Sequence, residues 1–133
     1  MPTSIFLNLP IKDLERSTAF FSALGCTFNP QFTDENATCM VISESIFAML
    51  LVEPFYQTFT AKQIVDATTQ SEALIGVSAD SRQEVDDVVD KAIAAGAIVS
   101  REAQDYGFMY SRTFDDLDGH TWEFIWMDHE HVQ

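Results

Sequence analysis

Basic residues are scarce in this chain. Only 7 of its 133 residues are Lys or Arg, against 21 Asp and Glu, so the formal net charge is −14. Phosphate backbones and anionic lipid surfaces are bound largely through Lys and Arg, and a surface of this charge repels both. The composition therefore excludes nucleic acid as a partner, and we expect no membrane partner.

Cysteines and long apolar segments are also few. Cys26 and Cys39 are the only two cysteines, and both stand in apolar surroundings that indicate buried thiols rather than a disulfide framework. No apolar run reaches the length of a membrane span, and the segment MPTSIFLNLP lacks the basic start and apolar core of a signal peptide. We expect a cytoplasmic protein.

What the chain does have is enough apolar residues for one core. Hydrophobic residues make up 47% of it and include 11 Phe, which supply large buried areas and can also line an apolar pocket. A chain of 133 residues has the usual size of one domain. We expect a single domain over residues 1–133.

The first half predicts one strand, one helix and three further strands. Residues 5–9 form a strand ended by Pro10, and a helix follows with Asp13 as its cap and Gly25 after its last turn. Three segments rich in Phe, Val, Ile and Thr come next, over 26–32, 37–43 and 46–53. Residues 61–67 suit one helical turn or two within a linker.

The second half repeats this order. A short strand over 74–79 precedes Ser81 and Glu84, which are spaced as a capping box, and the helix after them ends at Gly96. Strands are predicted over 98–101, 108–114 and 121–127. We place the first module at 1–56, the linker at 57–72 and the second module at 73–133.

A strand–helix–three-strand unit that occurs twice predicts the fold class. It is α+β, with two βαβββ modules, because one four-stranded module leaves a sheet face bare and a second can cover it. The competing architecture is a ferredoxin-like βαββαβ fold. The third strand after each helix argues against it.

Two stretches resemble the vicinal oxygen chelate superfamily, which includes glyoxalase I, bleomycin and fosfomycin resistance proteins and extradiol dioxygenases. Residues 9–21 (LPIKDLERSTAFF) are similar to its strand-to-helix motif, and residues 116–124 (DLDGHTWEF) to its turn into the last strand. The resemblance covers nearly the whole chain and is nearest to the proteins related to lactoylglutathione lyase. It implies a glyoxalase-like incomplete barrel, a binding cleft between the modules and a homodimer.

The resemblance also predicts the positions at which the family's metal ligands would lie. Metal-dependent members place a ligand on the first and last strand of each module. Those positions fall on Phe6 and Met49 in module one and on Leu74 and Glu123 in module two, and only Glu123 is a competent oxygen ligand. We predict that no metal is bound at the usual site and that no cofactor is needed.

Without a metal, the expected cleft is mostly apolar, as small-molecule pockets usually are. Its ligand-binding residues would be Phe6, Asn8, Met49, Leu51, Leu74, Phe108 and Tyr110. Glu123 would be the catalytic residue of any reaction, with Arg112 or Arg16 as its counter-charge. Alternatively, Glu123 is a structural remnant hydrogen-bonded to Asn8 or Tyr110.

Two functions stay open. The protein binds a small apolar or aromatic molecule without catalysis, or it is an enzyme, either a lyase of the glyoxalase I type or dioxygenase-like.

Three smaller expectations remain. Trp122 and Trp126 belong to the core under the helices, Phe55, Tyr56 and Phe59 form an aromatic patch, and His129 and His131 lie in a polar tail.

Overall fold

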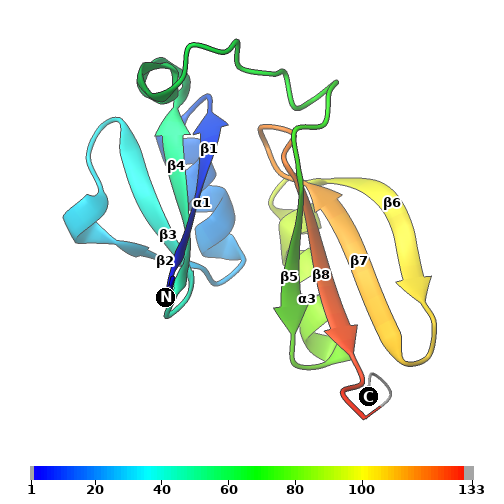
Figure 1. Ribbon diagram of the computed structural model, residues 1–133. Coiled ribbons are helices and arrows are strands. Elements are labelled where there is room, and N and C mark those ends of the chain that lie inside the picture. The colour runs from blue at the N-terminus through cyan, green and yellow to red at the C-terminus, as the bar shows by residue number, and fades with distance from the viewer. Residues whose placement is uncertain (1, 131–133) are drawn as a thin grey trace. The chain divides into compact units, whose positions relative to one another are not determined.

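The computed structural model describes residues 2–130, so His131 lies outside the described part of the chain. The chain forms two compact units, Met1–Ile64 and Val65–Gln133. From here on, module one and module two denote these two units, which divide the predicted linker 57–72 between them. Each contains a four-stranded sheet with one long helix against it (Figure 1).

Module one has the predicted order of elements. They are β1 (Ile5–Ile11), α1 (Leu14–Ala23), β2 (Thr27–Asn29), the 3-10 turn η1 (Pro30–Phe32), β3 (Ala37–Ser43), β4 (Ile46–Val52), α2 (Glu53–Tyr56) and the 3-10 turn η2 (Gln57–Phe59). The sheet order is β1-β4-β3-β2. β1 pairs with β4 in parallel, and the other neighbouring strands are antiparallel.

Module two has the same topology. Its elements are β5 (Leu74–Ala79), α3 (Arg82–Ala94), β6 (Ile98–Asp105), β7 (Met109–Asp115) and β8 (Thr121–Met127). The sheet order is β5-β8-β7-β6, with β5 and β8 parallel. The predicted fold class, α+β with two βαβββ modules, is confirmed, and neither sheet closes into a barrel.

Helix caps appear where the sequence places them. The Asp13 side chain accepts a hydrogen bond from the Arg16 backbone N–H at 3.1 Å, and Ser81 accepts one from Glu84 N–H at 3.0 Å. The Glu84 carboxylate reaches back to the N–H of Asp80 at 3.1 Å. Caps of this kind satisfy backbone donors that the first helical turn leaves free.

Several predicted boundaries are wrong. The strand predicted over 26–32 is the short β2 followed by η1, because Pro30 begins a 3-10 turn, and the strand predicted over 98–101 continues to Asp105 as β6. β1 does not end at Pro10 but continues to Ile11, because it lies at the edge of its sheet, where a missing N–H is tolerated. The helical turns after β4 lie at Glu53–Phe59 rather than at 61–67, with a proline in the first turn of α2. The boundaries of β1 and of the helical turns after β4 both affect which residues surround the candidate site described below.

Each sheet has one face under its long helix, and this face carries the core. In module one the core residues include Phe20 and Phe21 of α1 and Ala48 and Leu50 of β4, all at most 3% exposed. In module two they are Val85, Val89 and Ala92 of α3 with Phe114 and Trp122 of the sheet. Within residues 2–130, no helix is long and apolar enough to cross a membrane.

Candidate functional site

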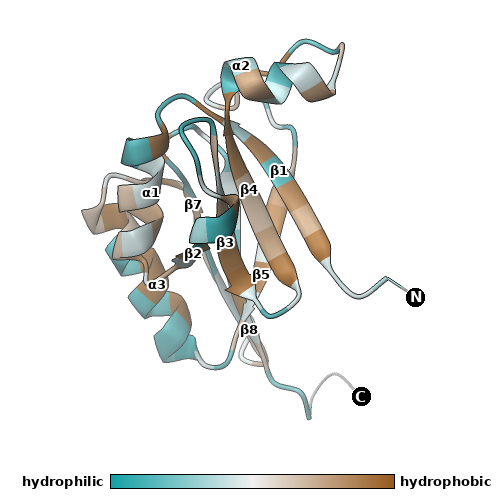
Figure 2. Ribbon diagram, turned by 90° about the vertical axis from the view of Figure 1, so that its left-hand side faces the viewer, coloured by the Kyte–Doolittle hydropathy of each residue, from teal (hydrophilic) through white to brown (hydrophobic). Residues whose placement is uncertain are grey.

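The face of the module-one sheet that lies opposite α1 is largely apolar. We call it the front face of module one. The strand register places Phe6 beside Phe47, Asn8 beside Met49 and Pro10 beside Leu51 on this face. The predicted grouping of Phe6, Asn8, Met49 and Leu51 on one face therefore agrees with the register. Figure 2 shows β1 and β4 as predominantly hydrophobic strands.

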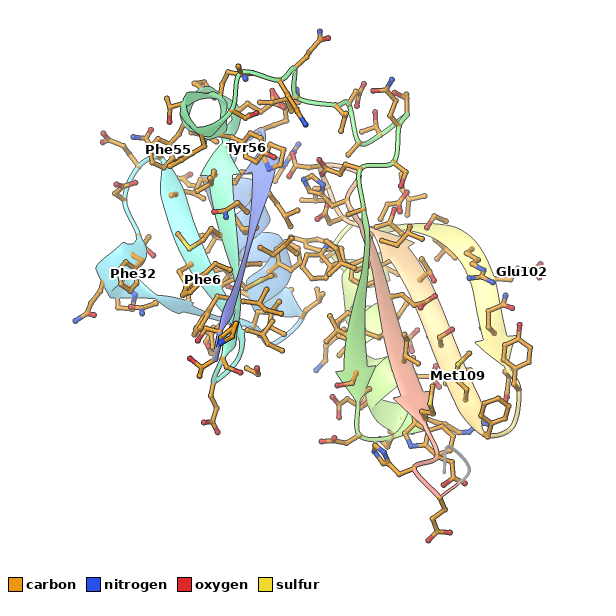
Figure 3. The ribbon with its side chains drawn as sticks, in the orientation of Figure 1. Phe6, Phe32, Phe55, Tyr56, Glu102 and Met109 are labelled. Carbon is orange, nitrogen blue, oxygen red and sulfur yellow. The ribbon has the colours of Figure 1, made fainter. Side chains whose placement is uncertain are left out.

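Part of this front face is hollowed below α2. Asn8 and Leu51 line a pocket of about 230 Å³ together with Tyr56, Phe59 and Thr60, which belong to α2, η2 and the residue after it. Figure 3 shows Tyr56 projecting from α2 toward the strand ends. The pocket thus combines a sheet floor with a rim from the segment that follows β4.

The start of α2 is held in place by an ion pair. Lys12 Nζ lies 2.9 Å from Glu53 Oε2 and donates to Glu53 Oε1 at 3.0 Å, which links the β1–α1 turn to the first residue of α2. A second hollow of about 340 Å³ lies at the other end of the sheet, between residues 2–5 and residues 45–46, and it is more open to solvent. None of the predicted site residues lines it.

The front face of module two, opposite α3, is more polar. By register, Glu123 lies between Gly76 of β5 and Thr113 of β7, and Arg101 of β6 lies beyond Thr113. Arg101 Nη1 is 3.7 Å from Glu123 Oε2, and both side chains are partly exposed. Leu74 is on this face too and is 77% exposed.

Tyr110 is not on the same face as Glu123. The register pairs it with Trp126, and its hydroxyl donates to Asp86 Oδ1 of α3 at 2.6 Å, so it lies under the helix. The expected grouping of Tyr110 with Glu123 is therefore wrong. Phe108 precedes β7 instead of belonging to it, and its carbonyl accepts the N–H of Asp128 at 2.7 Å.

The counter-charge of Glu123 also differs from expectation. Arg112 Nη1 donates to Asp86 at 3.1 Å and to Asp90 at 2.9 Å, both on α3, so its charge is used on the back of the sheet. The cation beside Glu123 is Arg101, which sequence reasoning missed. The sequence predicts that Arg101 belongs to a strand. The face of the sheet on which Arg101 lies depends on the irregular register between β6 and β7, which the sequence does not reveal.

The turn before β8 is built around a buried carboxylate. Asp116, 6% exposed, accepts hydrogen bonds from the backbone N–H of Asp118 and of His120, each at 3.0 Å, and from Trp122 Nε1 at 2.9 Å. Burial raises the pKa of Asp116, and the charge of His120 and these donors oppose that rise. Asp116 therefore serves the structure of the turn.

His120 ties this turn to the segment before β5. The ring is 4% exposed, and its Nδ1 lies 2.6 Å from Glu72 Oε1. Trp122, 2% exposed, is in the core as predicted, while Trp126 lies with its ring 5.1 Å from the guanidinium of Arg82 at the start of α3. Both tryptophans are on the helix side of the sheet.

Comparisons with known proteins identify the family of this chain. A family model described as bleomycin resistance protein-like N-terminal matches residues 3–43. A hypothetical protein (SA1046) from S. aureus is 31% identical over 94% of each chain, with a TM-score of 0.78. The chain belongs to the vicinal oxygen chelate superfamily.

More distant superfamily structures show the same fold. A glyoxalase/bleomycin resistance protein/dioxygenase family enzyme from Burkholderia phytofirmans is 15% identical, covering 92% of this chain and 96% of its own, with a TM-score of 0.77. A fosfomycin resistance protein from Listeria monocytogenes is 18% identical, covering 97% and 96%, with a TM-score of 0.68. No curated protein matches the sequence.

The positions at which the resemblance predicts the superfamily's metal ligands hold few donor atoms. Phe6 and Leu74 offer no donor atom, Phe6 stacks on Phe47 with ring centroids 5.0 Å apart, and Met49 offers only a thioether. Glu123 is the one oxygen ligand. Within residues 2–130, no group of three His, Cys, Asp or Glu side chains is placed to hold a metal ion.

Proposed function

We propose that this vicinal oxygen chelate protein binds a small apolar or aromatic molecule and does so without a chelated metal. The observation that carries the proposal is the front face of module one, where Phe6, Asn8, Met49 and Leu51 share a face and two of them line a pocket. Apolar walls with a few polar groups are the usual character of small-molecule sites.

The comparisons support this proposal at the level of the superfamily. The matched family model is named for bleomycin resistance, and it covers the segment that supplies β1, α1, β2 and β3. The Listeria structure is named for fosfomycin resistance. Both names refer to resistance to a small molecule, and a small molecule is the class of ligand that we propose.

The front face is tested by titrating ¹⁵N-labelled protein with indole and following backbone amide signals. We expect indole to shift amides of β1, β4 and α2. Phe6→Ala removes an exposed ring from the face, and stacking energies predict about 3- to 10-fold weaker binding. Phe32→Ala is the matched control, because Phe32 is 60% exposed and Phe6 59%, but Phe32 lies in η1.

Two outcomes would remove the proposal. One is an indole titration that leaves the amides of module one unchanged. The other is an equal loss of binding in Phe6→Ala and Phe32→Ala, because the effect would then not come from the front face.

A lyase of the glyoxalase I type, or dioxygenase-like chemistry, is the second candidate. One observation favours it: Glu123 stands on a sheet face beside Arg101, partly exposed and able to accept a proton. A glyoxalase I assay with added nickel or zinc tests it. We expect no turnover, and turnover that is lost in Glu123→Gln would replace the binding proposal with an enzymatic one.

A further inference from the structure

We infer that the pocket below α2 binds an uncharged, single-ring aromatic molecule whose substituent both donates and accepts hydrogen bonds, as a carboxamide does. The inference rests on the small-molecule binding proposed above and specifies its ligand. Asn8, Leu51, Tyr56, Phe59 and Thr60 line the pocket, and all five belong to module one.

The size of the pocket sets the size of the ligand. Its volume is about 230 Å³. An apolar cavity of roughly 150 Å³ holds one benzene molecule, whereas the pockets that bind drug-sized ligands measure about 300–1,000 Å³. One ring with a short substituent fits between these limits.

The lining selects against an ionic ligand. None of the five lining residues carries a charge at neutral pH, although the whole chain has a net charge of −14. Lys12 and Glu53 form the ion pair described above, and because their opposite charges balance each other, neither is left over for a charged ligand. An ion would lose hydration in the pocket and find no opposite charge in the lining to compensate for that loss, so a neutral molecule is favoured.

Two polar groups in the lining are available to the ligand. Within residues 2–130 the Tyr56 hydroxyl and the Asn8 side-chain oxygen have no hydrogen-bond partner, and the Asn8 amide nitrogen donates only a long bond of 3.4 Å to Phe6 O. A phenol and a primary amide each both donate and accept. A ligand group with both capacities satisfies them, whereas a purely apolar ring leaves them unpaired at a cost.

The rim of the pocket is already ordered. The Gln57 side-chain amide donates to the carbonyls of Thr60 at 2.9 Å and of Lys62 at 2.8 Å, which fixes the chain after η2. Phe59 packs edge-on against Phe55, with ring centroids 5.2 Å apart, yet is 69% exposed. A bound ring would cover Phe59, and little ordering would be required of the protein.

The test compares four single-ring probes on the full chain: benzamide, benzoate, benzylamine and toluene. They share the ring and differ in charge and hydrogen bonding. We expect benzamide to bind most tightly, with roughly millimolar affinity, and to shift the amides of residues 8, 51 and 53–60. Toluene should bind more weakly at the same amides.

Tyr56→Phe removes one hydroxyl and keeps the ring. Loss of one hydrogen bond predicts about 2- to 10-fold weaker binding of benzamide and no loss for toluene. Tyr106→Phe is the matched control: Tyr106 is an exposed tyrosine of module two, and its hydroxyl bonds Gln104. It should leave all four titrations unchanged.

The outcomes separate the two proposals. If toluene binds as well as benzamide, or benzoate or benzylamine binds better, the ligand class is wrong and small-molecule binding stands. If none of the four probes nor indole shifts the amides of module one, both proposals fail. Equal effects of Tyr56→Phe on benzamide and toluene also overturn the assignment.

Discussion

Arg82, the first residue of α3, is the most heavily engaged cation in module two. Its guanidinium donates two hydrogen bonds to the Asp105 carboxylate, at 2.9 and 2.8 Å, and one to Gly107 O at 3.0 Å. It also lies 5.1 Å from the ring centres of Tyr110 and Trp126. A planar cation suits both kinds of contact, so it joins the start of the helix to the sheet.

This arrangement predicts a pH dependence. The hydrogen bond from Arg82, aided by the N–H of Gly107, lowers the pKa of Asp105 from 3.8 to about 2. A lowered pKa means that the ionised carboxylate stabilises the fold above pH 3.8, and that this stability is lost as the pH falls toward 2. Asp105→Asn should therefore be less stable than the natural chain at pH 7, and the difference should shrink toward pH 2.5.

Urea unfolding at several pH values measures this difference. Asp87→Asn is the control, because the Asp87 carboxylate on α3 accepts from the neutral Gln83 side chain rather than from a cation. Its effect should not vary with pH in the same way. A difference for Asp105→Asn that stays constant from pH 7 to pH 2.5 would show that the ion pair does not contribute.

At the scale of elements, the β7–β8 turn is locked against the segment that precedes β5. Gly119 has φ +92°, and a Cβ built on it would lie 2.6 Å from the backbone of Ala67 and of Thr68. His120, one residue later, pairs with Glu72 of the same segment. The Asp-Gly turn that the sequence indicated thus has a second requirement, which is a close backbone approach.

Two glycine substitutions separate these requirements. Gly107 has φ +80° with nothing near its would-be Cβ, so Gly107→Ala should cost only the left-handed conformation, about 1–2 kcal/mol. Gly119→Ala adds the clash and should cost about 1–3 kcal/mol more. Urea unfolding measures both, and equal losses would mean that the turn does not depend on this contact.

The strands show what a sequence can and cannot predict. Element order and helix caps follow from local patterns, so both modules were predictable. The face of Tyr110 was not, because it depends on the pairing of Asp115 with Thr121, which closes the hairpin. A strand that is displaced by one residue exchanges its two faces. The turn between β7 and β8, which contains Asp116, shows no alternating pattern in the sequence from which the register of the two strands could be predicted.

The pocket was missed for a related reason. Asn8 and Leu51 were assigned to the correct face by alternation along one strand each. Tyr56, Phe59 and Thr60 come from irregular turns after β4, and their position depends on tertiary contacts such as the pair of Lys12 with Glu53. The sequence predicts an exposed aromatic patch with Phe55 and Phe59; Phe59 is indeed 69% exposed and packs on Phe55, and it also lies on the rim of the pocket.

At the scale of the whole molecule, the absence of metal at the superfamily's usual positions is a prediction for the purified protein. Phe6, Met49 and Leu74 leave Glu123 without partner ligands. Elemental analysis of protein purified without chelator or metal-affinity tag should find far less than one equivalent of metal per chain. Glu123→Ala should not change the value, and near one equivalent in the natural chain would contradict the prediction.

The homodimer implied by the resemblance is likewise a prediction for the whole molecule. Light scattering on the purified protein measures the mass directly. A monomer of 15.0 kDa at all concentrations would contradict it.

The parallel pairing of β1 with β4 and of β5 with β8 has a consequence for the order in which each module folds. The strands made last in a module pair beside the strand made first, whereas the antiparallel pairs join neighbours in the chain. Hairpins close quickly, but the parallel pair must wait for a long loop to close. During synthesis, β1 has to remain unpaired until β4 has been made, so this late step should set the folding rate of the module.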